Sequence, residues 1–141
     1  MQINLTTDYA IRSLLYITIQ NKPVASSAIA EAMSIPPTYL ISVMTKLKKA
    51  GLVSALRGNC GGYFLIRKPA DISLLDIIEA MEETMRINRC LEEDEYCNRF
   101  ATESCPVRDV YAAVQTYIEN SFSKVTLQSL REALRAKGGN C

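Results

Sequence analysis

The chain has no histidine among its 141 residues. This absence removes the commonest general base, the Ser/His and Cys/His nucleophile pairs, and the zinc motifs that use histidine. A Gly-rich loop of the P-loop or dinucleotide-binding type is missing as well. Little remains from which to build a conventional active site, and we expect that the protein is not an enzyme.

Long hydrophobic runs are also missing. No apolar stretch approaches the roughly 18 residues that a membrane span requires. The N-terminus, MQINLTTDYAIRSLL, lacks the basic start and the continuous apolar block of a signal peptide. These features predict a cytoplasmic protein with no membrane partner. Thiols stay reduced in that compartment, which favours metal or redox chemistry over disulfides.

Acidic residues are scarce in the first half of the chain. Residues 1–70 hold eight Lys/Arg and two acids, net +6, whereas residues 71–141 hold eight Lys/Arg and thirteen acids, net −5. This asymmetry suggests that the first half binds a polyanion and that the second half has another role. Charge alone does not name the polyanion, but the pattern of helices does.

Apolar residues recur at helical spacing over 7–20, over 26–33, and over 37–50 after a Pro-Pro turn. We expect Thr6 or Thr7 to cap the first helix and Ser26 or Ser27 to cap the second. A short helix, a tight turn and a longer helix form a helix-turn-helix. The runs LVSALR and YFLIRK around GNCGG predict a β-hairpin. The predicted fold is mainly α with a small hairpin, with a winged helix-turn-helix over residues 1–70.

A winged helix-turn-helix places its recognition helix in the major groove and its hairpin beside it. Lysines grouped behind the helix favour contact with phosphates, and an arginine in the wing can reach a phosphate or a groove edge. The residues predicted to face the duplex are Thr38, Tyr39, Ser42, Lys46, Lys48, Lys49, Arg57 and Asn59. Two alternatives stay open: Tyr39 belongs to the edge of the core, and the lysines form a solvated face.

The second part, residues 71–141, contains an amphipathic segment, a cysteine-rich segment and further helices. A long helix is predicted from Pro106 to about Phe122, followed by a short one at TLQSLREAL and a frayed tail. Apolar residues at Val107, Val110, Val114 and Tyr117 follow the three-four spacing that suits a partner helix. We therefore predict a homodimer through this helix. Packing within the same chain is the alternative.

Three of the five cysteines stand together in the polar stretch NRCLEEDEYCNRFATESCPVR. Cysteine is usually a small buried hydrophobe, and such a stretch offers little to pack against. Six residues separate Cys90 from Cys97 and seven separate Cys97 from Cys105, gaps too wide for the tight knuckles of structural zinc. Cys60, in the predicted wing turn, is expected to be either a small structural residue or an oxidant-sensitive thiol. Cys141 is expected to be incidental.

The order and the amino-acid sequences of these segments resemble the Rrf-type family of bacterial winged-helix regulators, typified by the iron–sulfur regulators IscR and NsrR. The matching segments are TTDYAIRSLLYI, YLISVMTKLKKAGLV, RGNCGGYFL, ISLLDIIEAME, the cysteine cluster and VTLQSL. The resemblance implies a homodimeric repressor that binds a two-fold-related DNA operator. It also implies an iron–sulfur cluster on the cysteine loop of each subunit, with iron or cluster supply, nitric oxide or oxidative stress as the signal.

Thiolates are the ligands of such clusters, which supports Cys90, Cys97 and Cys105 as metal ligands. In IscR-like members a histidine three residues after the last cysteine is the fourth ligand, whereas this chain has Arg108. NsrR-like members use an aspartate on the first helix of the opposite subunit, and Asp8 matches it. Asp8 is thus either the fourth ligand or an acid held by N–H groups at the helix start. A 4Fe–4S cluster is preferred to 2Fe–2S.

Two further points stay open at this stage. Arg89, Arg99 and Arg108 either offset the negative charge of a thiolate-bound cluster or are simply solvated. The cysteines either hold the cluster or form a thiol- or zinc-based redox switch that controls DNA binding without one.

Overall fold

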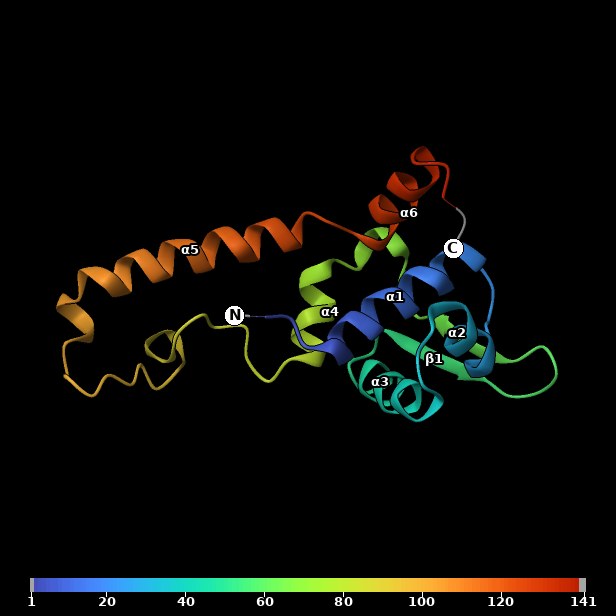
Figure 1. Cartoon of the computed structure of the whole chain (residues 1–141), viewed down its shortest axis with the longest axis horizontal. Coiled ribbons are helices and arrows are strands. Elements are labelled where there is room, and N and C mark those ends of the chain that lie inside the picture. The colour runs from blue at the N-terminus through green and yellow to red at the C-terminus, as the bar shows by residue number, and fades with distance from the viewer. Residues whose placement is uncertain (1, 140–141) are drawn as a thin grey trace.

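The computed structural model describes residues 2–139. Three helices come first, α1 (Leu5–Gln20), α2 (Ser26–Met33) and α3 (Pro37–Lys49), and the antiparallel hairpin β1 (Val53–Leu56) and β2 (Gly62–Leu65) follows. The rest comprises η1 (Pro69–Asp71), α4 (Leu74–Met81), η2 (Arg89–Leu91), η3 (Thr102–Ser104), α5 (Pro106–Ser123) and α6 (Leu127–Ala136). The prediction of a mainly helical, winged helix-turn-helix fold is confirmed (Figure 1).

The first two helices begin differently from the prediction. The side chain of Asn4 accepts a hydrogen bond from the N–H of Thr6 at 3.1 Å, so α1 starts two residues earlier than expected. Thr7 is instead buried, and its hydroxyl donates to the carboxylate of Glu82. The residue before α2 is Ala25, which has no side-chain acceptor. The predicted serine cap was therefore wrong, because both serines already belong to the helix.

One hydrophobic core joins the two predicted parts of the chain. Leu14 of α1 and Leu47 of α3 are fully buried, and so are Ile77 of α4 and Leu127 of α6. Burying a leucine or isoleucine side chain stabilises a fold by roughly 1.5–3 kcal/mol. The core therefore contains residues from both sides of residue 70. The division of the chain into two domains at that residue stays a prediction.

The wing is fixed to the helices by a short backbone ladder. Val24, between α1 and α2, and Tyr63 of β2 exchange two backbone hydrogen bonds of 2.9 and 2.8 Å. Gly62 makes this approach possible, because a Cβ atom there would lie 2.3 Å from the backbone of Val24, and its φ is +143°. A larger residue at Gly62 would separate the hairpin from the helices.

The long helix α5 projects away from the helix-turn-helix, with the cysteine loop beside its start (Figure 1). The chain then returns, and α6 packs against α1. The N–H of Gly139 donates to the carbonyl of Leu134 at 3.2 Å, so residues 137–139 form a capped helix end, while the last two residues of the predicted frayed tail lie outside the described residues. Cys141 lies outside the described residues. No helix within residues 2–139 is long and apolar enough to cross a lipid bilayer.

Candidate DNA-binding surface and cysteine site

Helix α3, the expected recognition helix, has one buried and one exposed face. Leu40, Val43, Met44 and Leu47 are buried at the spacing predicted from the sequence. This packing turns the opposite face of the helix outward, while the hairpin turn is exposed beside it. All the predicted DNA contacts are exposed: Thr38, Tyr39, Ser42, Lys46, Lys48, Lys49, Arg57 and Asn59. Cys60 is an exposed thiol in the same turn.

Tyr39 has features of both alternatives raised by the sequence. Its side chain is 54% exposed. Its ring also meets the ring of Tyr9 edge to face, with centroids 6.3 Å apart. Tyr9 in turn packs against the core. Tyr39 is therefore anchored at its base by an aromatic contact and leaves about half of its surface free.

The three clustered cysteines come from separate segments and line one pocket of about 260 Å³. Cys90 lies in η2, Cys97 follows the acidic turn, and Cys105 directly precedes α5. All three are half-buried, and Tyr96 and Arg108 complete part of the wall. The structure thus brings together the three thiols that the sequence singled out.

Zinc ions and iron–sulfur clusters require different arrangements of their ligands. Within residues 2–139, no three Cys, Asp or Glu side chains are grouped closely enough to hold a single metal ion. Structural zinc needs four ligands about 2.0–2.3 Å from one centre. A 4Fe–4S cluster offers a different iron atom to each thiolate, so its ligands surround a volume and do not converge on one point. Three thiols that line one pocket are compatible with the ligand arrangement of a cluster.

The surroundings of Cys97 favour its thiolate form. Backbone N–H groups of Ala101 and Arg99 lower the pKa of its thiol below the ordinary value. Phe100 between them has a φ of +53°, and a left-handed residue within such a turn directs neighbouring N–H groups toward an anion. A lower pKa favours the thiolate, the form that binds iron.

Two of the three arginines near the cysteines hold the loop together. The Nε–H of Arg108 donates to the carbonyl of Cys90 at 3.1 Å, and its Nη2 lies 2.6 Å from the carboxylate of Glu95. Arg89 pairs with Asp94, and this hydrogen bond lowers the pKa of that carboxyl. Arg108 is only 25% exposed and is held within the loop, whereas Arg89 is 66% exposed and remains largely solvated. Arg99 is exposed.

Gln115 is a structural residue that the sequence reasoning missed. Its side chain is buried within α5 and receives a hydrogen bond from the N–H of Ile87 at 2.9 Å. It also donates to the carbonyl of Met85 at 3.2 Å, so it fastens the segment that leads to the first cysteine. The available signal was its place between Tyr111 and Ile118, at the helical spacing of the inner face of α5.

Asp8 does not belong to the cysteine pocket of its own chain. It lies in the first turn of α1 with 53% of its side chain exposed, and it forms an ion pair of 2.9 Å with Arg12. Asp8 is therefore free to meet a second molecule, at the cost of a surface ion pair.

The sequence matches the Rrf2 family, described as iron-dependent transcriptional regulators, over residues 3–133. The chain belongs to the Rrf2 family. It is 30% identical to a putative HTH-type transcriptional regulator of Aquifex aeolicus, over 89% of this chain and 88% of that protein. It is also 30% identical to the HTH-type transcriptional regulator NsrR of Shouchella clausii, over 67% of this chain and 64% of that protein.

Two solved structures have the same architecture as this Rrf2 protein. IscR of T. potens superposes with a TM-score of 0.77 at 26% identity, covering 100% of this chain and 94% of the other. CymR, the global cysteine regulator of B. subtilis, also gives 0.77, at 23% identity, covering 94% and 98%. Like its Rrf2 relatives, the protein is a DNA-binding transcriptional regulator.

Proposed function

We propose that this Rrf2 protein is a homodimeric repressor whose operator binding is controlled by an iron–sulfur cluster held by Cys90, Cys97 and Cys105. The observation that carries the proposal is the common pocket lined by three half-buried thiols, which do not form a site for a single ion. The group would supply redox-active iron that reacts with oxidants or nitric oxide. The similarity to NsrR and IscR gives further support.

In this proposal, the exposed face of α3 reads the major groove and the hairpin turn lies beside it. The lysines at the end of α3 neutralise phosphates, and Arg57 in the wing reaches a phosphate or a base edge. The proposed contact residues are Thr38, Tyr39, Ser42, Lys46, Lys48, Lys49, Arg57 and Asn59, all of them exposed.

We propose that two copies of α5 pair to form the dimer. The apolar stripe of this helix is uncovered: Val107, Val110 and Val114 are 51%, 59% and 41% exposed, and Tyr117 is 74% exposed. The opposite side of α5 already contacts α4 and η2 of its own chain. An uncovered stripe with three-four spacing on a projecting helix is suited to a symmetric partner.

The fourth ligand is proposed to be Asp8 of the partner subunit. Asp8 is exposed and lies outside the pocket of its own chain, and this chain has no histidine. A carboxylate is a harder ligand than thiolate, so it is the ligand most easily exchanged. We propose a 4Fe–4S cluster, in which the three thiolates and the exchangeable carboxylate would each bind a different iron atom.

The cysteine loop has a direct route to the DNA-binding region. The loop is fastened to α5 by Arg108 and Gln115. At its other end, Glu82 accepts hydrogen bonds from the N–H of Asn4 at 3.0 Å and from the hydroxyl of Thr7. These two residues form the start of α1, which packs against α3. A displaced loop would therefore pull on the helix that supports the recognition helix.

The decisive experiment is anaerobic purification of the full-length protein. It should be brown, contain iron and sulfide, and lose its visible absorption on exposure to air or nitric oxide. Cys90→Ala, Cys97→Ala and Cys105→Ala should each lose iron. Cys60→Ala, a matched change of an exposed thiol outside the pocket, should keep it.

A thiol switch without a cluster is the second candidate, because the same fold occurs in CymR of Staphylococcus aureus, whose oxidised form has been solved. It predicts a colourless protein in which oxidation joins two of the pocket cysteines. Mass spectrometry after mild oxidation distinguishes the two functions. A colourless sample that contains zinc would likewise contradict the cluster.

A further inference from the structure

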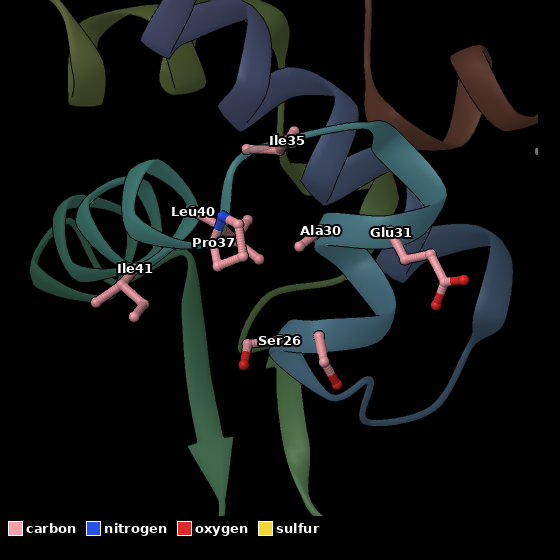
Figure 2. A pocket seen from close by; sticks show the side chains of 8 residues that line it. Ser26, Ala30, Glu31, Ile35, Pro37, Leu40 and Ile41 are labelled. Atoms are coloured by element: carbon pink, nitrogen blue, oxygen red, sulfur yellow. The ribbon is translucent and has the colours of Figure 1, made fainter.

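An apolar pocket of about 350 Å³ lies between the two helices of the helix-turn-helix. Figure 2 shows Ala30 of α2 pointing toward Pro37 and Leu40 of α3, with Ile41 on the same helix. The remaining lining residues are Ser26, Ser27, Glu31 and Ile35. The pocket is therefore built from the start of α2 and the first turns of the recognition helix.

Ile41 is the unusual residue of this pocket. It is 57% exposed, whereas its neighbour Leu40 is 1% exposed. Ile41 lies one turn after Thr38 and directly before Ser42, so it shares the side of α3 that carries the proposed DNA contacts. A single exposed isoleucine needs no explanation, but this one adjoins an apolar pocket and lies on the face assigned to a ligand.

The charge of the region identifies what covers this face. The last turn of α3 carries Lys46, Lys48 and Lys49, and residues 1–70 have a net charge of +6. A polyanion is drawn to such a surface, so the occupant of the exposed side of α3 is duplex DNA. Within the major groove, only thymine presents an apolar group, its 5-methyl; the other base edges present hydrogen-bond donors and acceptors.

We propose that Ile41 and the adjoining pocket receive the 5-methyl group of a thymine in each half-site, which makes Ile41 a specificity-determining residue. The inference rests on the proposed DNA-binding face. An apolar wall excludes water without offering hydrogen bonds, so a base edge that must pair with a polar group is disfavoured there. The methyl group makes no hydrogen bond to water, so its burial breaks none.

The test uses duplexes with and without that methyl group. Cluster-loaded and cluster-free samples of the full-length protein are each incubated with a random library of DNA duplexes, and the bound duplexes are recovered. The sample that enriches a pool of sequences is used in the following steps. The pool is then copied with deoxythymidine or with deoxyuridine, which lacks only the 5-methyl. Burial of one methyl predicts a roughly fourfold preference for thymidine per half-site, and more for a dimer on two half-sites.

Ile41→Ala should bring the thymidine-to-deoxyuridine affinity ratio close to one. Ile66→Ala is the matched control, because Ile66 is an equally exposed isoleucine at 55%, beyond the end of β2. It should keep the wild-type ratio. In the best single site, replacing thymidines one at a time should identify one position per half-site that accounts for the Ile41-dependent loss.

If the thymidine-to-deoxyuridine affinity ratio of Ile41→Ala equals that of the wild type, this inference is wrong. The proposed DNA-binding surface would not be affected by that result. A loss spread evenly over all thymidines would also overturn the inference. If no pool is enriched from the unmodified library by either form, the proposed DNA-binding surface fails as well, so the two failures are distinguishable.

Discussion

The region around the recognition helix and the cysteine loop are built in opposite ways. The helices of the first region bury complete side chains, such as Leu14, Met44 and Leu47. Between residues 82 and 105, no side chain is fully buried, and the backbone forms only two short 3-10 turns. Polar contacts to α5 hold that segment in place. Regions with few buried apolar contacts open most easily, and a bound group stabilises them most.

This contrast suits a sensor. A well-packed region keeps the exposed face of α3 in one arrangement, while a weakly packed loop would change on loss of the proposed cluster. The two regions meet where Glu82 accepts hydrogen bonds from the first residues of α1. The following predictions test the difference between the regions, from the largest expected effect to the smallest.

Charges on the projecting helix should have the largest effect. Val110→Glu combined with Val114→Glu places like charges against their symmetry mates, and such juxtaposition costs several kcal/mol. We expect monomers in sedimentation experiments. The matched control is Thr116→Glu with Asn120→Glu, two exposed positions of α5 outside the apolar stripe, which should leave a dimer. A dimeric double-valine variant would place the interface elsewhere.

A substitution in the hydrophobic core should have the next largest effect. Leu14→Ala removes a fully buried side chain and should lower the free energy of unfolding by about 2–5 kcal/mol. Leu5→Ala, on the same helix but 58% exposed, should change it by less than about 0.5 kcal/mol. Urea titration followed by circular dichroism measures both. Equal effects would contradict the description of this region as the well-packed one.

Arg57→Ala should weaken operator binding without destabilising the fold. The side chain is exposed in the wing turn, and the loss is about 1–3 kcal/mol if the contact is to a base edge. Binding measured over a salt series distinguishes this case from a phosphate contact. Loss of a phosphate contact would also reduce the dependence of the affinity on salt concentration. Lys124→Ala, an exposed charge beyond α5, is the control. Unchanged affinity at every salt concentration would remove Arg57 from the interface.

The local pattern of the sequence predicted the elements well and their distant contacts poorly. The buried face of α3 follows from periodicity alone, and the uncovered stripe of α5 was visible as an excess of apolar residues. The contribution of Leu127 to the core was not visible, since it depends on the chain returning after α5. Gln115 was missed because a buried amide is identified by its partners, here the backbone of residues 85 and 87.

The predictions of the helix caps were wrong for a different reason. Several Ser, Thr and Asn residues near a helix start compete for the same role, and the choice depends on the backbone of each. Asn4 is extended and caps α1, whereas the hydroxyl of Thr7 donates to Glu82, directly after α4. For the cysteines, the sequence located the pocket-forming residues, but the roles of Arg89 and Arg108 emerged only from their hydrogen-bond partners.

Asp8 provides the smallest change in stability and the most specific test of the two regions. Within residues 2–139 its carboxylate makes only a surface ion pair with Arg12, and exposed pairs of this kind contribute about 0.3–0.5 kcal/mol. Asp8→Ala should therefore leave the free energy of unfolding almost unchanged. If the carboxylate also ligates the partner subunit's cluster, the three thiolates still retain a chromophore, but its absorption spectrum changes and cluster-dependent DNA binding weakens.

Arg12→Ala is the control that separates the two roles of Asp8. It removes the same ion pair and leaves the carboxylate in place, so the wild-type spectrum should persist. Spectra recorded anaerobically, before and after nitric oxide, report on the cluster and not on the DNA-binding face that Arg12 supports through Tyr9. A spectrum and a gas response of Asp8→Ala identical to those of the wild type would mean that another group is the fourth ligand. A changed spectrum in Asp8→Ala alone would connect the cysteine loop of one subunit to the first helix of the other.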